Sequence, residues 1–185
     1  MIVLIGESAS GKTTLANKFI NKYPEYHRIV TYTTRPKREN EADGIDYHFI
    51  PDDEFTELVK RDFFVEHAEY RGWLYGTAKE DCIKNKSSIV ILTPSGLRNL
   101  KKIKKEIKSV YLYVDRRSRL INILLRGDNI DEAYRRNLSD VGQFDGVMNE
   151  VDYVIDNTKF HMDEDETLKC LEAILKKGDV YAKNI

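Results

Sequence analysis

The first thirteen residues of the chain, MIVLIGESASGKT at Met1–Thr13, decide its fold. A short apolar run, Met1–Ile5, leads directly into the pattern G-x-x-x-x-G-K-[ST] at Gly6–Thr13. This pattern requires a buried strand before it and a helix after it. The residues behind the motif carry an apolar face at helical spacing, which Pro24 brings to an end. We therefore predict a strand, a phosphate-binding P-loop and a helix, in that order.

The residue types in this loop indicate its chemistry. Gly6 and Gly11 let the backbone curl until successive N–H groups point into one anion-binding concavity, and the helix N-terminus adds partial positive charge beneath it. Lys12 is placed to reach the β- and γ-phosphates of a nucleotide, and the Thr13 hydroxyl is placed to ligate Mg²⁺. The loop alone does not distinguish an ATPase, a GTPase and a kinase.

Strand and helix patterns alternate along the rest of the chain. This alternation after a P-loop predicts an α/β fold of the P-loop NTPase type, a five-stranded parallel sheet with helices on both faces. The pattern Thr77-x-x-Glu80 is typical of a capping box, so a helix is expected to begin at Thr77. The five predicted strands are Met1–Ile5, Arg28–Val30, Ser88–Leu92, Ser109–Val114 and Tyr153–Ile155.

The stretch 31–77 differs from the rest because it is rich in short strands and aromatic residues. We interpret it as a small β-rich insertion. It should roof part of the ligand site, since ligands bind such sheets at the carboxyl ends of the strands. Its first part, 31–44, is polar and shows no evident element, and connections of this length are usually functional.

Length and composition suit a single domain, 1–185. With 41% hydrophobic residues and a net charge of −1 the chain has no global basic field, so nucleic acid is not an expected partner. The sequence contains no apolar run of membrane-spanning length, so no membrane association is expected. Cys82 and Cys170 show no motif spacing, which favours a reducing compartment. We expect a cytoplasmic protein, either monomeric or homodimeric.

Four further motifs follow the P-loop in a defined order, at Thr33–Arg38, Gly44–Phe49, Phe64–Glu66 and Tyr75–Thr77. This series resembles the guanylate kinase family in order and nearly in spacing. The resemblance is strong from the N-terminus to the fourth motif, and weaker at 126–127 and 152–157. It implies a nucleoside monophosphate kinase with ATP as phosphoryl donor. The implied parts are a core at 1–30, 78–125 and 144–185, an acceptor-binding insertion at 31–77 and a helical lid at about 126–143.

The resemblance also implies a role for each matched residue. Arg35 and Arg38 look like the pair that grips the acceptor phosphate, a task that suits planar guanidinium forks. Glu66 resembles the carboxylate that accepts from guanine N1–H and the 2-amino group, which adenine lacks. The implied acceptor-binding residues are Thr31, Arg35, Arg38, Tyr47, Glu66, Tyr75, Gly76, Thr77 and Thr93. The implied ATP-binding residues are Gly6, Ser8, Ala9, Ser10, Gly11, Lys12, Thr13, Thr14 and Asn157, with Mg²⁺ on Thr13.

Arginines of the lid are expected to stabilise the transferring phosphoryl group. Arg126 matches the first of them. Asn137 stands where the family has another arginine, so Arg135 or Arg136 is expected to act instead, and the sequence leaves open which one.

Three other positions depart from the family pattern. Ile91 and Thr93 stand where two aspartates are usual, and Glu7 stands where a proline is common. Because neither Ile91 nor Thr93 supplies a carboxylate, base choice is expected to be less strict.

Taken together, the motifs predict transfer of the γ-phosphoryl group of ATP to GMP or dGMP, with Mg²⁺ as cofactor. The predicted catalytic residues are Lys12, Arg126, Arg135 and Arg136. One alternative is a kinase for another nucleoside monophosphate. The other is an inactive guanylate-kinase-like module that binds protein partners. That module would have a damaged phosphate loop, whereas Gly11-Lys12-Thr13 is intact.

Overall fold

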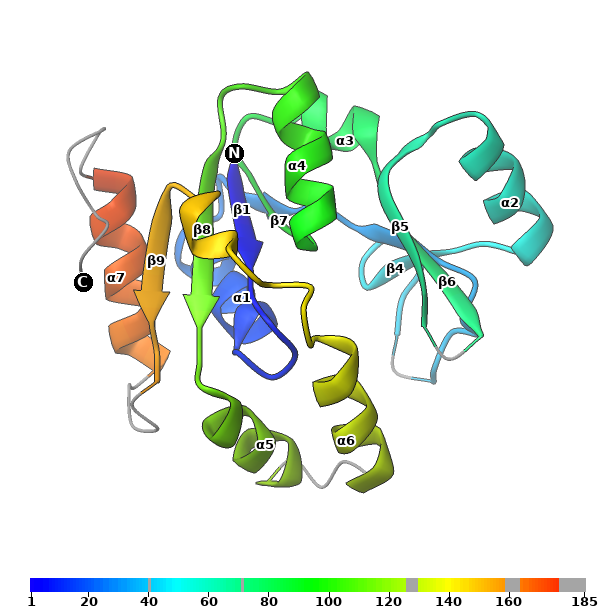
Figure 1. Cartoon of the computed structure of the whole chain (residues 1–185). Helices are drawn as coiled ribbons and strands as arrows, with labels where there is room; N and C mark the ends of the chain where they lie inside the picture. Colours follow the sequence, from blue (N-terminus) through cyan, green and yellow to red (C-terminus); the bar gives the residue numbers. More distant parts are fainter. Residues whose placement is uncertain (40, 71, 126–129, 159–163, 177–185) are drawn as a thin grey trace.

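A five-stranded parallel sheet forms the centre of the molecule (Figure 1). The structure is a computed structural model, and it describes residues 1–39, 41–70, 72–125, 130–158 and 164–176. The strand order is β2-β7-β1-β8-β9, and every pairing is parallel. The predicted fold class is therefore confirmed. The strands are β1 (Ile2–Ile5), β2 (His27–Arg28), β7 (Ser88–Ile91), β8 (Lys108–Tyr113) and β9 (Tyr153–Asp156).

Helices cover both faces of this sheet (Figure 1). On one face α1 (Lys12–Lys22) and α7 (Glu164–Lys176) pack with Leu15, Phe19 and Leu171 into the first core cluster. On the other face α3, α4 and the short helix η1 pack against the alternate side chains of the same strands. Their bounds are Lys79–Lys84 for α3, Pro94–Ile103 for α4 and Val147–Asn149 for η1. Burial on both faces explains why β1 is apolar throughout and why β7 is apolar after Ser88.

A second sheet of four strands lies beside the central one, in the order β4-β3-β6-β5. Its strands are β3 (Thr31–Thr33), β4 (Tyr47–Phe49), β5 (Phe64–Tyr70) and β6 (Trp73–Ala78), and α2 (Asp52–Lys60) joins β4 to β5. The expectation that 31–44 holds no element was wrong, because Thr31–Thr33 is the strand between β4 and β6. Three residues are too few to show a period, so their pairing partners decide the conformation.

Other boundaries also differ from those expected. The helix predicted to begin at Thr77 begins at Lys79, and Thr77 belongs to β6, where it pairs with Glu66. Strand pairing therefore took precedence over the capping pattern. The strand predicted at 28–30 is β2 at His27–Arg28.

Two helices follow β8 and lie at the end of the sheet that carries the P-loop (Figure 1). They are α5 (Arg116–Leu125) and α6 (Ile130–Ser139), and they pack against each other. Among the helices that the structure describes, none is both long and apolar enough to cross a membrane.

Candidate functional site

The P-loop joins the carboxyl end of β1 to α1 in the geometry that its sequence predicts. Gly11 has a φ of +92°, in the left-handed region that favours glycine. A Cβ at Gly6 would lie 2.7 Å from the carbonyl oxygen of Leu112, so the loop can pass β8 this closely only with glycine. Lys12 Nζ donates to the carbonyl oxygen of Glu7 at 2.6 Å and to Ser10 Oγ at 3.3 Å. The lysine therefore lies along the loop, and the Thr13 side chain is exposed.

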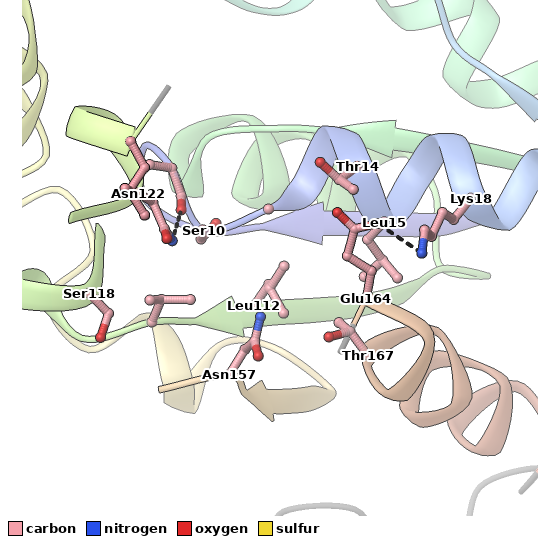
Figure 2. Close-up of a pocket in the computed structure, with 14 residues that line it drawn as sticks. Ser10, Thr14, Leu15, Lys18, Leu112, Ser118, Asn122, Asn157, Glu164 and Thr167 are labelled. Atoms are coloured by element: carbon pink, nitrogen blue, oxygen red, sulfur yellow. Dashed lines mark hydrogen bonds and ion pairs between the residues drawn. The ribbon is translucent and has the colours of Figure 1, made fainter. Parts of the chain in front are cut away.

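A cavity of about 380 Å³ opens beside this loop (Figure 2). Its lining brings together residues from the loop and α1, Ala9–Gly11 and Thr14, with Asn157 from the end of β9. Asn122 of α5 lies on the same wall and donates from Nδ2 to the carbonyl oxygen of Ala9 at 3.3 Å. The polar loop and the apolar side chains of Leu15 and Leu112 together suit a flat base attached to phosphates.

Glu66 is positioned by a contact between the second sheet and the core. It lies on β5 opposite Thr77, next to a register shift between Phe64 and Glu66. Its Oε2 accepts from the backbone N–H of Thr93 at 2.9 Å and from Thr93 Oγ1 at 2.5 Å. Thr93 is also the N-cap of α4, where its side chain accepts from the N–H of Gly96. The carboxylate thus lies at a helix N-terminus, where negative charge is favoured.

The pKa of Glu66 reflects two opposing effects. Burial raises it, and the hydrogen bonds from Thr93 and from the Thr77 hydroxyl lower it. Gly96 makes this arrangement possible, because a Cβ there would lie 2.2 Å from Glu66 Oε2. The sequence did not single out Gly96, since the residue that requires it is thirty positions away.

Arg35 is buried and held on several sides. Its NH2 group lies 2.6 Å from Glu41 Oε1, and its NH1 group donates to the carbonyl oxygen of Pro36 at 2.9 Å. Its guanidinium lies over the rings of Tyr47 and Phe49, 5.4 Å and 5.7 Å from their centroids. The hydrogen bond that Arg35 donates to Glu41 raises the pKa of Arg35, so the guanidinium stays charged.

The other predicted acceptor residues surround Arg35 and Glu66. Tyr47 and Tyr75 lie with ring centroids 6.0 Å apart, and the Tyr75 hydroxyl also hydrogen-bonds Arg35. Arg38 is exposed, and its backbone N–H donates to Glu41 Oε2 at 2.8 Å. The structure therefore groups two clusters on the second sheet, one around Arg35 and one around Glu66. Thr31, Gly76 and Thr77 lie on the central strands of that sheet, β3 and β6.

The arginines predicted to act in a lid, Arg126, Arg135 and Arg136, are only partly described. Arg126 lies outside the described residues, as does the side chain of Arg136. The Arg135 side chain on α6 is exposed. Of the two departures at the end of β7, Ile91 packs against the first core cluster, and Thr93 holds Glu66.

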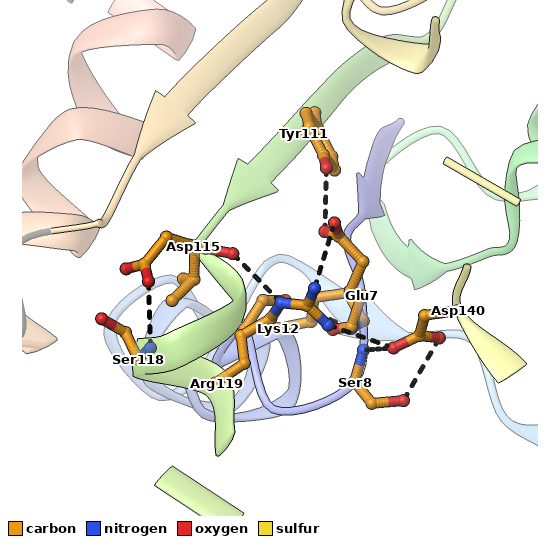
Figure 3. Close-up of polar contacts among 10 residues, drawn as sticks. Glu7, Ser8, Lys12, Tyr111, Asp115, Ser118, Arg119 and Asp140 are labelled. Carbon is orange, nitrogen blue, oxygen red and sulfur yellow. Dashed lines mark hydrogen bonds and ion pairs between the residues drawn. The ribbon is translucent and has the colours of Figure 1, made fainter. Parts of the chain in front are cut away.

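A largely buried charged cluster that the sequence did not reveal lies beside the P-loop (Figure 3). Its members are Glu7 and Ser8 from the loop, Tyr111 from β8, Arg119 from α5 and Asp140, which follows α6. Tyr111 donates to Glu7 Oε2 at 2.8 Å, and the Ser8 N–H donates to Asp140 Oδ2 at 2.8 Å. The one sequence feature that pointed to this cluster was Glu7, a charged residue at a position where the family commonly has a proline.

Comparison with known proteins places these features in one family. The family model described as Guanylate kinase matches residues 1–178. A guanylate kinase from Nostoc sp. is 31% identical, over 86% of this chain and 83% of its own length. A guanylate kinase from Thermobifida fusca is 30% identical, over 94% of this chain and 91% of its own length. The crystal structure of a guanylate kinase from Anaplasma phagocytophilum superposes with a TM-score of 0.68 at 22% identity, covering 99% of this chain and 87% of that one.

Proposed function

This chain belongs to the guanylate kinase family, and we infer from that premise that it transfers the γ-phosphoryl group of ATP to GMP. The enzyme is a phosphotransferase, so it needs two phosphate sites held in line and no covalent intermediate. The inactive protein-binding alternative is disfavoured, because the P-loop keeps its lysine, its glycines and its strand–loop–helix geometry.

The observation that carries the choice of guanine is the position of Glu66. A carboxylate is a pure acceptor, and guanine presents two adjacent donors at N1 and the 2-amino group. Thr93 holds Oε2 at the N-terminus of α4 and Gly96 leaves room for it, so the carboxylate is oriented before a base arrives. Adenine offers no matching pair of donors, and a base that leaves this carboxylate unpaired is disfavoured.

We assign the two nucleotides to the two sides of the site. The P-loop residues and Asn157 bind ATP, and the cavity beside the loop takes its base. The second sheet, within 31–77, binds the acceptor through Arg35, Arg38 and Glu66, assisted by Thr31, Tyr47, Tyr75, Gly76 and Thr77. Lys12 and the arginines 126, 135 and 136 act on the transferring group, with 126–143 as the lid. Thr93 serves the acceptor site through its hold on Glu66.

Mg²⁺ is the proposed cofactor. The exposed Thr13 hydroxyl at the first turn of α1 is open to an ion that arrives with the nucleotide, and such a hydroxyl is a hard oxygen ligand that suits Mg²⁺. Within the described residues no group of three acidic, histidine or cysteine side chains could hold an ion by itself. The phosphates of ATP would then provide most of its ligands, and the ion would neutralise charge during transfer.

A cytoplasmic location is part of the same proposal. It is supported by the two cysteines, which are both free thiols, Cys82 buried and Cys170 partly so. A monomer and a homodimer both remain compatible with the chain, and sedimentation of the purified enzyme distinguishes them.

A coupled assay with ATP·Mg²⁺ and each ribo- and deoxyribonucleoside monophosphate tests the function. GMP or dGMP is expected to have the highest kcat/KM. IMP, which lacks only the 2-amino group, should be turned over at a rate lower by roughly ten- to a hundredfold, the usual effect of one lost hydrogen bond to a base edge. A higher kcat/KM for AMP, CMP or TMP would contradict the assignment of Glu66.

A further inference from the structure

The charged cluster beside the P-loop contains one carboxylate that occupies a phosphate-like position. Asp140 Oδ2 accepts from the Ser8 N–H at 2.8 Å, and Arg119 NH1 lies 3.3 Å from the same oxygen (Figure 3). A backbone N–H of a P-loop and a guanidinium N–H are the two kinds of donor that phosphoryl oxygens receive in proteins. A phosphoryl oxygen placed at Oδ2 would receive the same two hydrogen bonds.

The carboxylate of Asp140 offsets one of two positive charges beside the phosphate loop. Glu7 and Asp140 contribute two negative charges, and Arg119 and Lys12 contribute two positive charges, so these four side chains sum to zero (Figure 3). Three of them are little exposed, with 10% of the Glu7 side chain, 8% of Arg119 and 13% of Asp140 accessible. Buried charges are weakly screened, so the charge of Asp140 weakens the attraction of this site for a triphosphate. Without Asp140 the remaining three side chains carry a net charge of +1.

The members of the cluster differ in how firmly they are held. Arg119 Nε donates to the carbonyl oxygen of Val114 at 3.1 Å. Arg119 also lies on α5 about one helical turn before Asn122, whose side chain donates to the carbonyl oxygen of Ala9 in the P-loop. Glu7 is fixed by Tyr111. Asp140 instead comes directly after α6, the helix that carries Arg135, and Asp140 Oδ1 lies 3.4 Å from Ser8 Oγ. Asp140 can therefore leave with α6 while Arg119 stays at the loop.

We propose that Asp140 occupies a phosphate position in the nucleotide-free enzyme, and that the triphosphate of ATP displaces it, so that Arg119 and the Ser8 N–H become phosphate-binding groups. Arg119 then supplies a buried cation next to Lys12, in a chain whose lid has Asn137 where the family has an arginine. Because Asp140 lies at the end of α6, its displacement links ATP binding to movement of that helix. The inference rests on the proposed use of the P-loop for ATP.

Calorimetric titration with Mg²⁺ and the non-hydrolysable analogue AMP-PNP tests the proposal on the full chain. Asp140→Asn keeps the size of the side chain and removes its charge, so the Kd should fall about fivefold or more, because a competing internal ligand no longer lowers the fraction of competent enzyme. Arg119→Gln should raise the Kd about tenfold, as expected for a lost charged hydrogen bond. The double variant should bind more tightly than Arg119→Gln alone, because Asp140 also competes for the Ser8 N–H, and more weakly than Asp140→Asn.

Asp145→Asn is the matched control. Asp145 is exposed, and together with Glu7, Arg119 and Asp140 it lines a cavity of about 580 Å³. Its neutralisation should leave the Kd unchanged. Asp140→Ala gives a second variant with the same expected direction, and thermal unfolding verifies that each variant is folded.

If Asp140 only braces the loop, Asp140→Asn will bind AMP-PNP as tightly as the unmodified enzyme or more weakly, and the proposal is then wrong. An equal gain in Asp145→Asn would also overturn it, because the effect would be one of general charge. These results are independent of the acceptor. An enzyme that binds AMP-PNP as described and fails to phosphorylate GMP would contradict the proposed acceptor and not the displacement.

Discussion

At the scale of single residues, Lys12 is the cation that we expect the P-loop to place at the phosphates of ATP. Its ammonium now donates to the Glu7 carbonyl and Ser10, and both contacts can be exchanged for phosphate oxygens. Lys12→Ala should remove about 3 kcal/mol or more of transition-state stabilisation, which lowers kcat/KM by roughly a hundredfold or more. Steady-state kinetics checks this. Lys18→Ala, which removes a lysine at the cavity rim that pairs with Glu164 and Asp165, should cost far less. A near-normal kcat in Lys12→Ala would show that transfer occurs elsewhere.

Arg35 is expected to act on the acceptor and not on ATP. Arg35→Ala should raise the KM for GMP and lower kcat, while the KM for ATP changes little, because the residue lies on the second sheet with Tyr47 and Glu41. Arg35→Lys should recover only part of the loss, since an ammonium cannot bind two oxygens in one plane. The measurement is a pair of KM values, one for each substrate. An equal rise in both would contradict the assignment.

Thr93 is predicted to act through Glu66, and the pH dependence of the KM for GMP is the sharpest test. Glu66 must be ionised to accept from guanine. Burial raises its pKa, and the Thr93 hydrogen bonds lower it. Thr93→Val removes the hydroxyl contribution, so the pKa should rise further. Since the KM for GMP increases as pH falls through this pKa, the increase should begin at higher pH in Thr93→Val than in the unmodified enzyme.

Thr93→Ser is the control for that profile, because it retains the hydroxyl and should retain the original pH dependence. Among the described residues, the hydroxyls of Thr77 and Thr93 hydrogen-bond Glu66, and the thiol of Cys82 on α3 interacts with its charge. Burial raises the pKa of Cys82 to about 12, so this thiol does not titrate in the range of the assay. Identical pH profiles for the valine and serine variants would show that the hydroxyl plays no part in base recognition.

At the scale of elements, α4 connects the central sheet to the second sheet. Its N-terminus holds Glu66 through Thr93, and Asn99 donates from its side chain to the Val65 carbonyl at 3.0 Å. Gly96 is packed against the Glu66 carboxylate, so its hydrogen atom is the only substituent that fits. A change in this helix is therefore expected to affect the acceptor and leave ATP unaffected.

Gly96→Ala tests this role of α4. In an ordinary helix this substitution stabilises by about 0.5–1 kcal/mol, because alanine loses less backbone freedom on folding. Here the added Cβ would lie 2.2 Å from Glu66 Oε2 and must displace it. The KM for GMP should rise by roughly tenfold or more, the usual cost of a lost charged hydrogen bond, with the KM for ATP as internal control. An unchanged KM for GMP would mean that Glu66 does not read the base.

At the scale of the whole molecule, the second sheet and α6 are expected to close on the phosphates only when both nucleotides are bound, since closure excludes water from the transferring group. Amide hydrogen exchange should slow at Glu41–Gly44 and along α6 with a bisubstrate analogue, and less with either nucleotide alone. The amides of β8 serve as a control, because that strand lies inside the central sheet. Equal protection in the free and bound enzyme would argue for a preformed, rigid site.

The sequence by itself determined the P-loop, the alternation of strands and helices, and most residues proposed for the two nucleotides. These features depend on neighbours within a few positions, where spacing and residue type control the backbone. The sequence was wrong at Thr77 and missed β3, because strand pairing overrides a capping pattern and three residues show no period.

Only the tertiary structure decided what holds the site together. Thr93 meets Glu66 across 27 positions, Tyr111 meets Glu7 across 104, and Asp140 meets Ser8 across 132. No local pattern records such contacts, because they arise when parallel strands bring distant loops to the same end of the central sheet and, for Glu66, when a strand of the second sheet meets α4. The same reason explains why Gly96 and Arg119 were not foreseen: each is specified by a carboxylate that only folding brings beside it.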